Sequence, residues 1–158
     1  MAFVHLRAHT EFSVVDGTVR IDDLVKLAAK DNQPAVAVTD LSNLFGAVKL
    51  YSAARKKGVQ PIIGADIWLE SEEAGRVPQR LLLLIQNSAG YLRLCELLGE
   101  AWTAPGQRTH AWVSWTSLTA NNAGLICLSG AEMGPVGQAI LMGDVPKAEA
   151  WAKKLADA

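Results

Sequence analysis

The sequence has little cysteine and no marked excess of either charge, and these shortages exclude several classes of protein. Only two cysteines, Cys95 and Cys127, occur in 158 residues, far apart and within apolar runs. They are too few for a disulfide framework, so two buried free thiols in a reducing compartment, the cytoplasm, are predicted. The formal net charge of -1 lacks the basic excess expected of a module that binds duplex DNA by itself.

Long hydrophobic runs are also missing. The longest, 81–85, is far shorter than the roughly 20 residues that a membrane-spanning helix needs. His5 and Arg7 interrupt the apolar residues near the N-terminus, so no signal peptide and no membrane partner are expected. The apolar share of 50% and the charged share of 20% are typical of a globular domain, and the length fits one such domain.

The most informative stretch is the alternating one at the N-terminus. Apolar and polar residues alternate along 4–9, which predicts a strand with one polar face. That face carries His5, Arg7 and His9, and Asp16 follows within a turn sequence. Two imidazoles and a nearby carboxylate are how a divalent metal site would be laid out. Arg7 argues against a metal, because a guanidinium has no lone pair to donate and repels a cation.

Periodicity predicts the remaining elements. Apolar residues at helical spacing predict helices, and short apolar runs predict strands, in the following ranges: helices 21–30, 43–57, 88–102, 134–142 and 145–158, and strands 35–39, 61–69, 79–86 and 124–129. Alternating strands and helices with short connections predict a parallel sheet with right-handed crossovers. A charged loop is expected over 70–78. Trp112 and Trp115 lie in a stretch without a clear pattern, where packing beneath a loop is predicted and a nucleotide-stacking surface is the alternative.

Three motifs carry a resemblance to a known family. The stretches 3–17 (FVHLRAHTEFSVVDG), 37–46 (AVTDLSNLFG) and 58–66 (GVQPIIGAD) resemble, in order and spacing, the start of bacterial replicative DNA polymerase III alpha subunits. The part matched is their N-terminal polymerase-and-histidinol-phosphatase (PHP) domain. The stretch 89–94 (AGYLRL) resembles the family's next helix, so the resemblance covers essentially the whole chain.

The resemblance implies an α/β fold: a partial PHP-type (β/α) barrel of parallel strands with flanking helices. Five predicted strands cannot close the seven-stranded barrel of the family, so the barrel is expected to be truncated before closure. Residues 1–158 are then the N-terminal portion of the PHP domain, with the rest of the barrel and the polymerase domains absent. Open sheet edges are expected to let such a fragment self-associate.

The resemblance also implies which residues to inspect. Active PHP proteins hold a metal cluster by histidines and carboxylates, and the first His-x-His pair maps onto Arg7 and His9 here. The histidine of a Thr-Asp-His motif is replaced by Leu41, whereas an acid persists at Asp66. The vestigial site is therefore Arg7, His9, Asp16, Asp40, Leu41 and Asp66. With two ligands replaced, no catalytic residue, bound metal or cofactor is expected in this chain.

The surviving charges suggest a second use of the site. Arg7 brings a positive charge where metal ligands are lost. Our hypothesis is that it pairs with some of Asp16, Asp40 and Asp66 in a salt-bridged plug that holds the strand ends together, although buried ion pairs are often no more stabilising than apolar packing.

By resemblance, the parent protein is a DNA-directed DNA polymerase that extends DNA with Mg²⁺ held in its polymerase domain, and it contacts DNA through its full length. This stretch is then a structural PHP domain and a docking surface for the proofreading exonuclease subunit and other polymerase III holoenzyme subunits. The alternative is a metal-dependent phosphoesterase or 3′–5′ exonuclease of the PHP class, for which positions 7 and 41 should both be histidine. A single-stranded nucleic-acid binder using Trp112 and Trp115 is a third hypothesis, which the near-neutral charge disfavours.

Overall fold

The computed structural model describes residues 3–70, 79–105 and 110–158. The chain divides into two compact units, Met1–Asp66 and Ile67–Ala158, and we describe each by itself. Strand β2 (Gln60–Leu69) begins in the first unit and ends in the second. The charged loop expected over 70–78 lies, apart from its first residue, outside the described residues.

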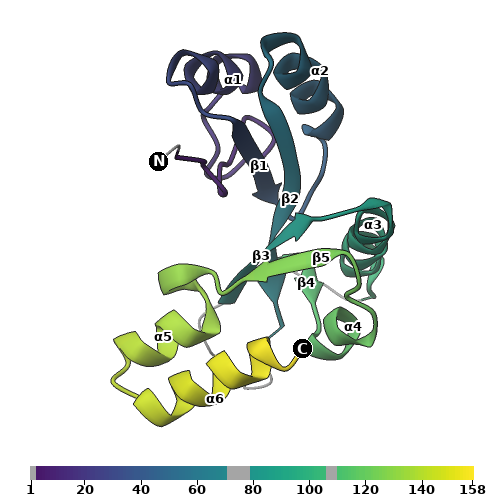
Figure 1. The fold of residues 1–158 in the computed structure, drawn as a ribbon. Coiled ribbons are helices and arrows are strands. Elements are labelled where there is room, and N and C mark those ends of the chain that lie inside the picture. The colour runs from purple at the N-terminus through teal and green to yellow at the C-terminus, as the bar shows by residue number, and fades with distance from the viewer. Residues whose placement is uncertain (1–2, 71–78, 106–109) are drawn as a thin grey trace. The chain divides into compact units, whose positions relative to one another are not determined.

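The first unit is built on two parallel strands and two helices. Its elements are α1 (Ile21–Lys30), β1 (Ala35–Leu41), α2 (Ala47–Lys57) and the first part of β2. Strands β1 and β2 pair in parallel from Ala35 opposite Gln60 to Leu41 opposite Asp66. Helix α1 packs beside α2 and against β1 (Figure 1). The parallel pairing and the range of α1 confirm the prediction for this part of the chain.

The core of the first unit is made of small and branched apolar side chains from both helices and the sheet. It consists of Ile21, Val25, Ala28, Val36, Val38, Leu50, Ala54 and Val59. Helix α1 presents it with residues at helical spacing, as predicted. Apolar spacing within 43–57 predicts a buried face that includes Val48 and Tyr51. This is wrong for α2, where both side chains are exposed. Gly58 ends α2 in the left-handed region, at φ 70°, as its position after a basic last turn indicates.

The strand predicted over 4–9 is not formed as a regular strand. This segment makes a single parallel bridge, His5 to Val36, and two backbone bonds, from Ala37 N to His5 O at 2.8 Å and from Thr39 N to Ala8 O at 2.9 Å. The amide of Ala8 donates instead to the Thr39 hydroxyl at 3.2 Å. Because a side chain takes the place of a backbone acceptor, the ladder does not continue, although the segment still runs along β1.

The second unit mixes parallel and antiparallel strands. Its further elements are β3 (Gln79–Ile85), α3 (Ser88–Thr103), β4 (Trp112–Val113), α4 (Trp115–Ala120), β5 (Leu125–Leu128), the short 3₁₀ helix η1 (Ala131–Met133), α5 (Pro135–Leu141) and α6 (Val145–Ala156). The order in the sheet is β1-β2-β3-β5, with β4 beside β2. Helices α5 and α6 pack together as a hairpin (Figure 1).

The prediction of an all-parallel sheet is wrong for the last strand, because β5 pairs antiparallel with β3, from Leu82 opposite Leu128 to Ile85 opposite Leu125. The amide of Gln86 donates to the carbonyl of Gly124 at 2.9 Å. The chain therefore enters β5 beside the end of β3 and can only run back along it. The fold is thus an open sheet of parallel and antiparallel strands with flanking helices.

The buried face of α3 also differs from the one that apolar spacing within 88–102 predicts, which consists of Tyr91, Leu94, Cys95, Leu98 and Trp102. Leu94, Leu97 and Ala101 are buried, whereas Tyr91 and Trp102 are exposed. Both cysteines are free and exposed, so their predicted burial is wrong. Cys95 follows the buried Leu94, and one residue along a helix turns a side chain by about 100° away from the core.

Candidate functional site at the ends of strands β1 and β2

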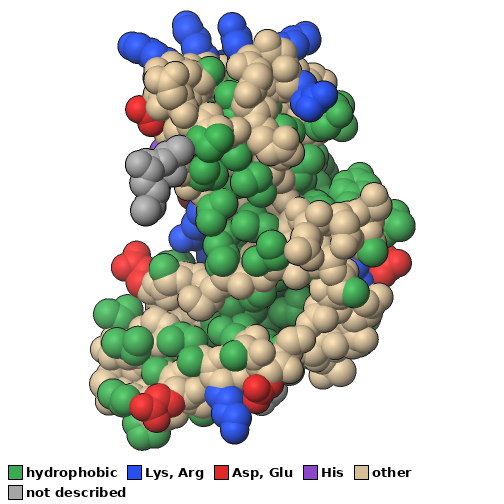
Figure 2. Space-filling view, viewed as in Figure 1, with side chains coloured by type: hydrophobic (Ala, Val, Ile, Leu, Met, Phe, Trp, Pro, Cys, Tyr) green, Lys and Arg blue, Asp and Glu red, His purple; other side chains and the backbone are tan. Residues whose placement is uncertain are grey.

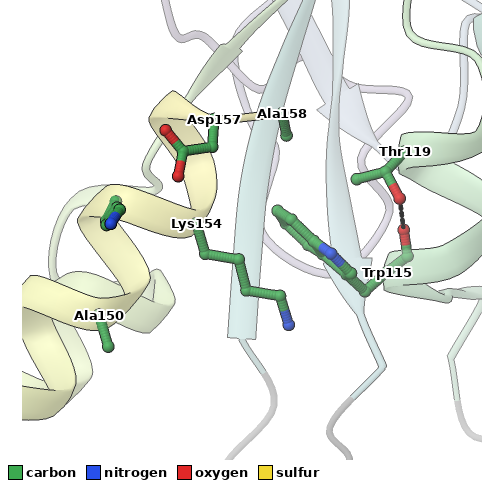
Figure 3. Close-up of a pocket in the computed structure, with 7 residues that line it drawn as sticks. Trp115, Thr119, Ala150, Lys154, Asp157 and Ala158 are labelled. Carbon is green, nitrogen blue, oxygen red and sulfur yellow. Dashed lines mark hydrogen bonds between the residues drawn. The ribbon is translucent and has the colours of Figure 1, made fainter.

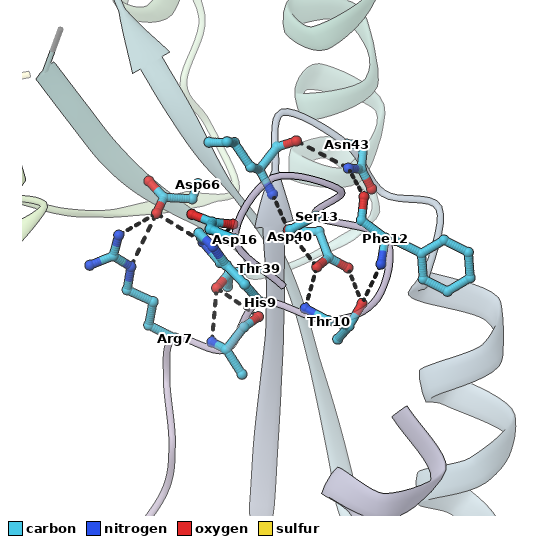
Figure 4. A network of polar contacts seen from close by, with 12 residues as sticks. Arg7, His9, Thr10, Phe12, Ser13, Asp16, Thr39, Asp40, Asn43 and Asp66 are labelled. Atoms are coloured by element: carbon cyan, nitrogen blue, oxygen red, sulfur yellow. Dashed lines mark hydrogen bonds and ion pairs between the residues drawn. The ribbon is translucent and has the colours of Figure 1, made fainter. Parts of the chain in front are cut away.

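The side chains singled out by the sequence meet in the first unit, at the end of β1 and beside Asp66 of β2. Asp40 and Leu41 are the last residues of β1, and Asp66 lies opposite Leu41 on β2. Arg7 and His9 reach this point from the N-terminal segment that runs along β1. Figure 4 shows the side chains of Arg7 and His9 pointing toward Asp66. The register of two parallel strands therefore collects residues that are far apart in the sequence.

Arg7 and Asp66 form the central ion pair. Arg7 donates to Asp66 Oδ2 from Nε at 3.1 Å and from Nη2 at 2.6 Å. The Asp66 side chain is only 1% exposed, whereas that of Arg7 is 39% exposed. The aspartate is therefore held in a buried position, where a carboxylate needs a charged or hydrogen-bonding partner. Arg7 supplies that partner while part of its side chain remains in contact with solvent.

His9 lies between two carboxylates. Its Nδ1 is 2.8 Å from Asp16 Oδ1 and its Nε2 is 3.0 Å from Asp66 Oδ2. A neutral imidazole carries one N–H, so only the protonated ring can donate both bonds. The hydrogen bond to Asp66 raises the pKa of His9 above its ordinary value, partial burial opposes this rise, and Asp16 adds to it. With His9 protonated, two cations face two carboxylates and the cluster is neutral.

This cluster does not fit a divalent metal as it is arranged. Asp66 Oδ2 already accepts hydrogen bonds from Arg7 and from His9. Both ring nitrogens of His9 face carboxylates, so neither directs a lone pair at an open position. Within residues 3–70, 79–105 and 110–158, no three His, Cys, Asp or Glu side chains are grouped as metal ligands.

Asp40 belongs to a separate network of neutral donors. Its Oδ1 accepts from the Thr10 amide at 2.6 Å and the Ser13 hydroxyl at 2.8 Å, and its Oδ2 accepts from the Thr10 hydroxyl at 2.8 Å. Of the three aspartates that the sequence offered to Arg7, the observed ion pair is therefore with Asp66, and Asp40 is held by Thr10 and Ser13. Sequence reasoning did not assign these two hydroxyl residues. Their position directly after the alternating stretch was the available signal.

Backbone contacts around Leu41 close the loop over this network. The amide of Leu41 donates to the Ser13 hydroxyl at 2.9 Å. Asn43 Nδ2 donates to the carbonyls of Phe12 and Leu41, each at 3.0 Å. These bonds join the 10–16 segment to the end of β1. They fix the backbone on which Asp40 and Leu41 are carried, as the network in Figure 4 shows.

His5 and His110 each lie against aromatic rings. His5 is exposed and its ring meets Phe3 edge to face at a centroid distance of 4.7 Å. In the second unit, the His110 ring lies 4.5 Å from Trp68 and 5.3 Å from Trp112. His110 is thus part of an aromatic cluster that includes Trp112.

Trp115 belongs to a different aromatic cluster. Its ring meets Trp151 edge to face at 5.6 Å. The ammonium of Lys154 lies 4.6 Å from the Trp115 ring and 4.5 Å from that of Trp151. Trp115 and Lys154 both line a pocket of about 610 Å³. Figure 3 shows the Lys154 side chain extending toward the Trp115 ring. Since Trp112 packs with Trp68 and His110 instead, the two tryptophans of the stacking hypothesis contribute to different clusters.

In the described part of the chain, no helix combines the length and the apolar character that crossing a membrane requires.

The raised pKa of His9 leads to a prediction about pH. A group whose pKa is higher in the folded state stabilises that state fully below its unfolded pKa, which is about 6.5 for histidine. The free energy of unfolding is therefore expected to decline as the pH rises through the raised pKa of His9. Urea denaturation at a series of pH values from about 5 to about 9 measures this decline in the free energy of unfolding. A His9→Gln variant should lose this part of the pH dependence. An NMR titration that places the pKa of His9 at or below its ordinary value would contradict the prediction.

Comparison with known proteins supplies the family. A family model described as "PHP domain" matches residues 5–158. The chain is 48% identical over 153 residues to a protein of Pseudomonas aeruginosa named DNA polymerase III subunit alpha, covering 95% of this chain and 13% of that protein. The proteins of that name from Neisseria meningitidis serogroup A and Escherichia coli K12 are 42% and 39% identical over 98% and 90% of this chain. The chain spans 12 to 14% of the length of these relatives.

Solved structures agree at the level of the fold. A Bifidobacterium adolescentis protein described as a metal-dependent phosphoesterase aligns with a TM-score of 0.51 and 23% identity, over 64% of this chain and 33% of that one. An amidohydrolase from Chromobacterium violaceum, solved with sulfate and no metal, aligns with a TM-score of 0.51 and 21% identity. The alignment covers 63% of this chain and 33% of that one. At these identities the likeness concerns the fold alone. The family match over residues 5–158 shows that this chain belongs to the PHP domain family.

Proposed function

We propose that this chain acts as the N-terminal PHP domain of a bacterial replicative DNA polymerase III alpha subunit. The support is the identity of 39 to 48% over 90 to 98% of the chain to proteins of that name. In this proposal, other parts of a longer protein extend DNA with Mg²⁺, in the cytoplasm. The open sheet of the two units is then part of a PHP-type (β/α) barrel that is not closed within these residues.

Within that protein, we assign the PHP site a structural role in place of metal catalysis. The observation that carries this is the ion pair of Arg7 with the buried Asp66, completed by His9. The Arg7 guanidinium binds Asp66 directly and neutralises the carboxylate, as a metal would. Arg7 and His9 thereby tie the N-terminal segment to Asp66 of β2, without an open coordination position for water.

The proposed role includes docking. A domain that keeps its fold and loses its metal site can still bind other subunits through its surface. We propose the proofreading exonuclease subunit of the polymerase III holoenzyme as its partner. This part of the proposal depends on the resemblance of the chain to alpha subunits. DNA would be contacted through the longer protein, which is in keeping with the net charge of -1 on this chain.

A metal titration tests the structural role. Calorimetry with Zn²⁺ and Mn²⁺ is expected to show no tight uptake by the natural chain. The double variant Arg7→His, Leu41→His is expected to bind these metals about 10-fold more tightly or better. It removes the repelling cation and adds two imidazoles next to Asp66. The single variants are the matched controls, and each should gain less than the pair.

Tight uptake of more than one ion per natural chain would contradict the structural role. It would favour the alternative, a metal-dependent phosphoesterase or 3′–5′ exonuclease of the PHP class. That alternative requires Arg7 to swing away from Asp66, so hydrolysis of a phosphoester by the natural chain with Mn²⁺ would be the decisive second measurement.

A further inference from the structure

Helix α3 of the second unit carries an apolar face that is exposed to solvent. Tyr91, Leu92 and Trp102 are 45%, 61% and 63% exposed, and Cys95 is exposed as well. Positions 92, 95, 99 and 102 follow one another at steps of three or four residues, so they lie along one side of the helix. Figure 2 shows hydrophobic side chains on the surface over α3, at the right of the view. We call this side the outer seam, with Leu92, Cys95, Gly99 and Trp102 along its centre and Tyr91 at its margin.

The opposite side of α3 is apolar too. Leu94, Leu97 and Ala101 are buried there and hold the helix on its own unit. A surface helix is normally apolar along one stripe, whereas a helix that is apolar on both sides is normally covered on both. Contiguous apolar patches that remain exposed on a folded chain mark sites of interaction. The outer seam therefore has the character of an interface.

Gly99 lies at the centre of the outer seam. Inside a helix, glycine is less favourable than alanine, because its backbone loses more freedom on folding. A Cβ built on Gly99 would meet nothing within 4 Å, so packing within this chain does not require the glycine. Its missing side chain leaves a notch between Cys95 and Trp102, which a side chain of another helix can enter as a knob enters a hole. A close approach from outside gives this glycine a role that the fold does not.

One edge of the outer seam is acidic. Glu96 and Glu100 form the row of side chains next to it, and they are 62% and 57% exposed. The buried Arg93 is the basic residue of α3, and its Nη1 lies 3.1 Å from Glu96 and 3.7 Å from Glu100. Glu70 lines the same small pocket as Glu100. Three carboxylates thus share one guanidinium, and this edge carries a net negative charge.

We propose that the outer seam binds a helix of a partner protein, apolar along one stripe and with lysine or arginine beside that stripe. A large apolar side chain of this helix sits over Gly99, and its cations face Glu96 and Glu100. A second copy of α3 would bring two further glutamates to the contact and only the buried Arg93, so charge disfavours pairing of this seam with itself. The inference rests on the docking role proposed above and assigns a surface to it.

The test is an NMR titration of the ¹⁵N-labelled natural chain with a helical peptide of about 15 residues. This lysine peptide carries leucine at heptad spacing, lysine beside the leucines and alanine elsewhere. Saturable shifts are expected at the amides of Cys95 and Gly99 and at the indole N–H of Trp102. A matched peptide with glutamate in place of lysine keeps the apolar stripe. It should bind about 10-fold more weakly, because it brings like charge to Glu96 and Glu100.

The variant Gly99→Ala separates binding from folding. Its added methyl group fills the notch, so the lysine peptide should bind it roughly 5- to 10-fold more weakly. The same substitution should raise the urea denaturation midpoint, because alanine favours the helix, so the loss of binding cannot come from unfolding. Ser52→Ala, at an exposed position of α2, is the control and should leave the affinity unchanged.

Several results would overturn the proposal. The absence of saturable shifts would exclude a helix of this kind. Equal affinity for the two peptides would show that the acidic edge takes no part, and unchanged binding by Gly99→Ala would place the helix elsewhere. Concentration-dependent shifts of the same amides without peptide would identify a second copy as the occupant. Binding of the exonuclease subunit that Gly99→Ala leaves unchanged would keep the proposed docking role and overturn this surface alone.

Discussion

Replacing Gly90 by alanine is expected to destabilise the second unit by about 3 kcal/mol, whereas Gly99→Ala in the same helix should stabilise it by roughly 0.5 to 1 kcal/mol. A Cβ built on Gly90 would lie 1.8 Å from the carbonyl oxygen of Gly124, while one on Gly99 meets nothing within 4 Å. The opposing atoms at Gly90 are backbone, so they cannot rotate away. Gly99 is exposed inside α3, where alanine favours the helix.

The clash at Gly90 would reach the start of the helix and the last strand together. The side chain of Asn87, the N-cap residue of α3, accepts from the Gly90 amide at 3.1 Å. The carbonyl of Gly124 accepts from Gln86 at the end of β3. Moving either backbone to make room therefore breaks a cap or the bond that brings β5 beside β3. This is why the expected loss exceeds that of an ordinary overpacked side chain.

Tryptophan fluorescence is a suitable measurement. All five tryptophans of the chain lie in the second unit, so urea denaturation followed by fluorescence reports that unit. Gly90→Ala should lower the denaturation midpoint and Gly99→Ala should raise it slightly. Equal effects of the two substitutions would show that α3 and the Gly124 turn are not in close contact.

The second large effect is expected at Asp40. Asp40→Ala should destabilise the first unit by about 3 kcal/mol, because it leaves buried donors without their acceptor. The side chain is 1% exposed, and its donors Thr10 and Ser13 are 0% and 2% exposed, so water does not readily replace the carboxylate. Asp40→Asn keeps one acceptor oxygen and the shape of the side chain, so it should destabilise the first unit clearly less than Asp40→Ala.

A matched control is available on the surface of the same unit. Asp22→Ala removes an exposed carboxylate from the first turn of α1, and it should cost less than about 1 kcal/mol. Hydrogen exchange at the amides of Ala37 and Thr39 measures the stability of β1, where the N-terminal segment is bound. Unchanged protection in Asp40→Ala would mean that the carboxylate does not hold the 10–16 segment on the strand.

The sequence by itself determined helix α1, strand β1 and the end of helix α2 in the first unit, and it named the residues of the proposed site. Apolar spacing gave α1, a short apolar run gave β1, and Gly58 after a basic turn gave the end of α2, because each of these signals lies within one short window. The positions 7, 9, 16, 40 and 66 could be named in advance from motifs. They gather because Leu41 and Asp66 are opposite each other in a parallel pair.

Only the tertiary structure decided which groups touch. Arg7 and Asp66 are separated by 59 positions, and no local pattern states whether that arginine meets Asp40 or Asp66. The direction of β5 was equally open, because the alternation within a strand is the same whichever way the strand runs, and the turn at Gly124 beside the end of β3 settled it. The preference of a segment for helix, strand or turn depends on residues that are neighbours in the sequence. Pairing depends on where the whole chain places strand ends, helix ends and the donors that buried carboxylates require.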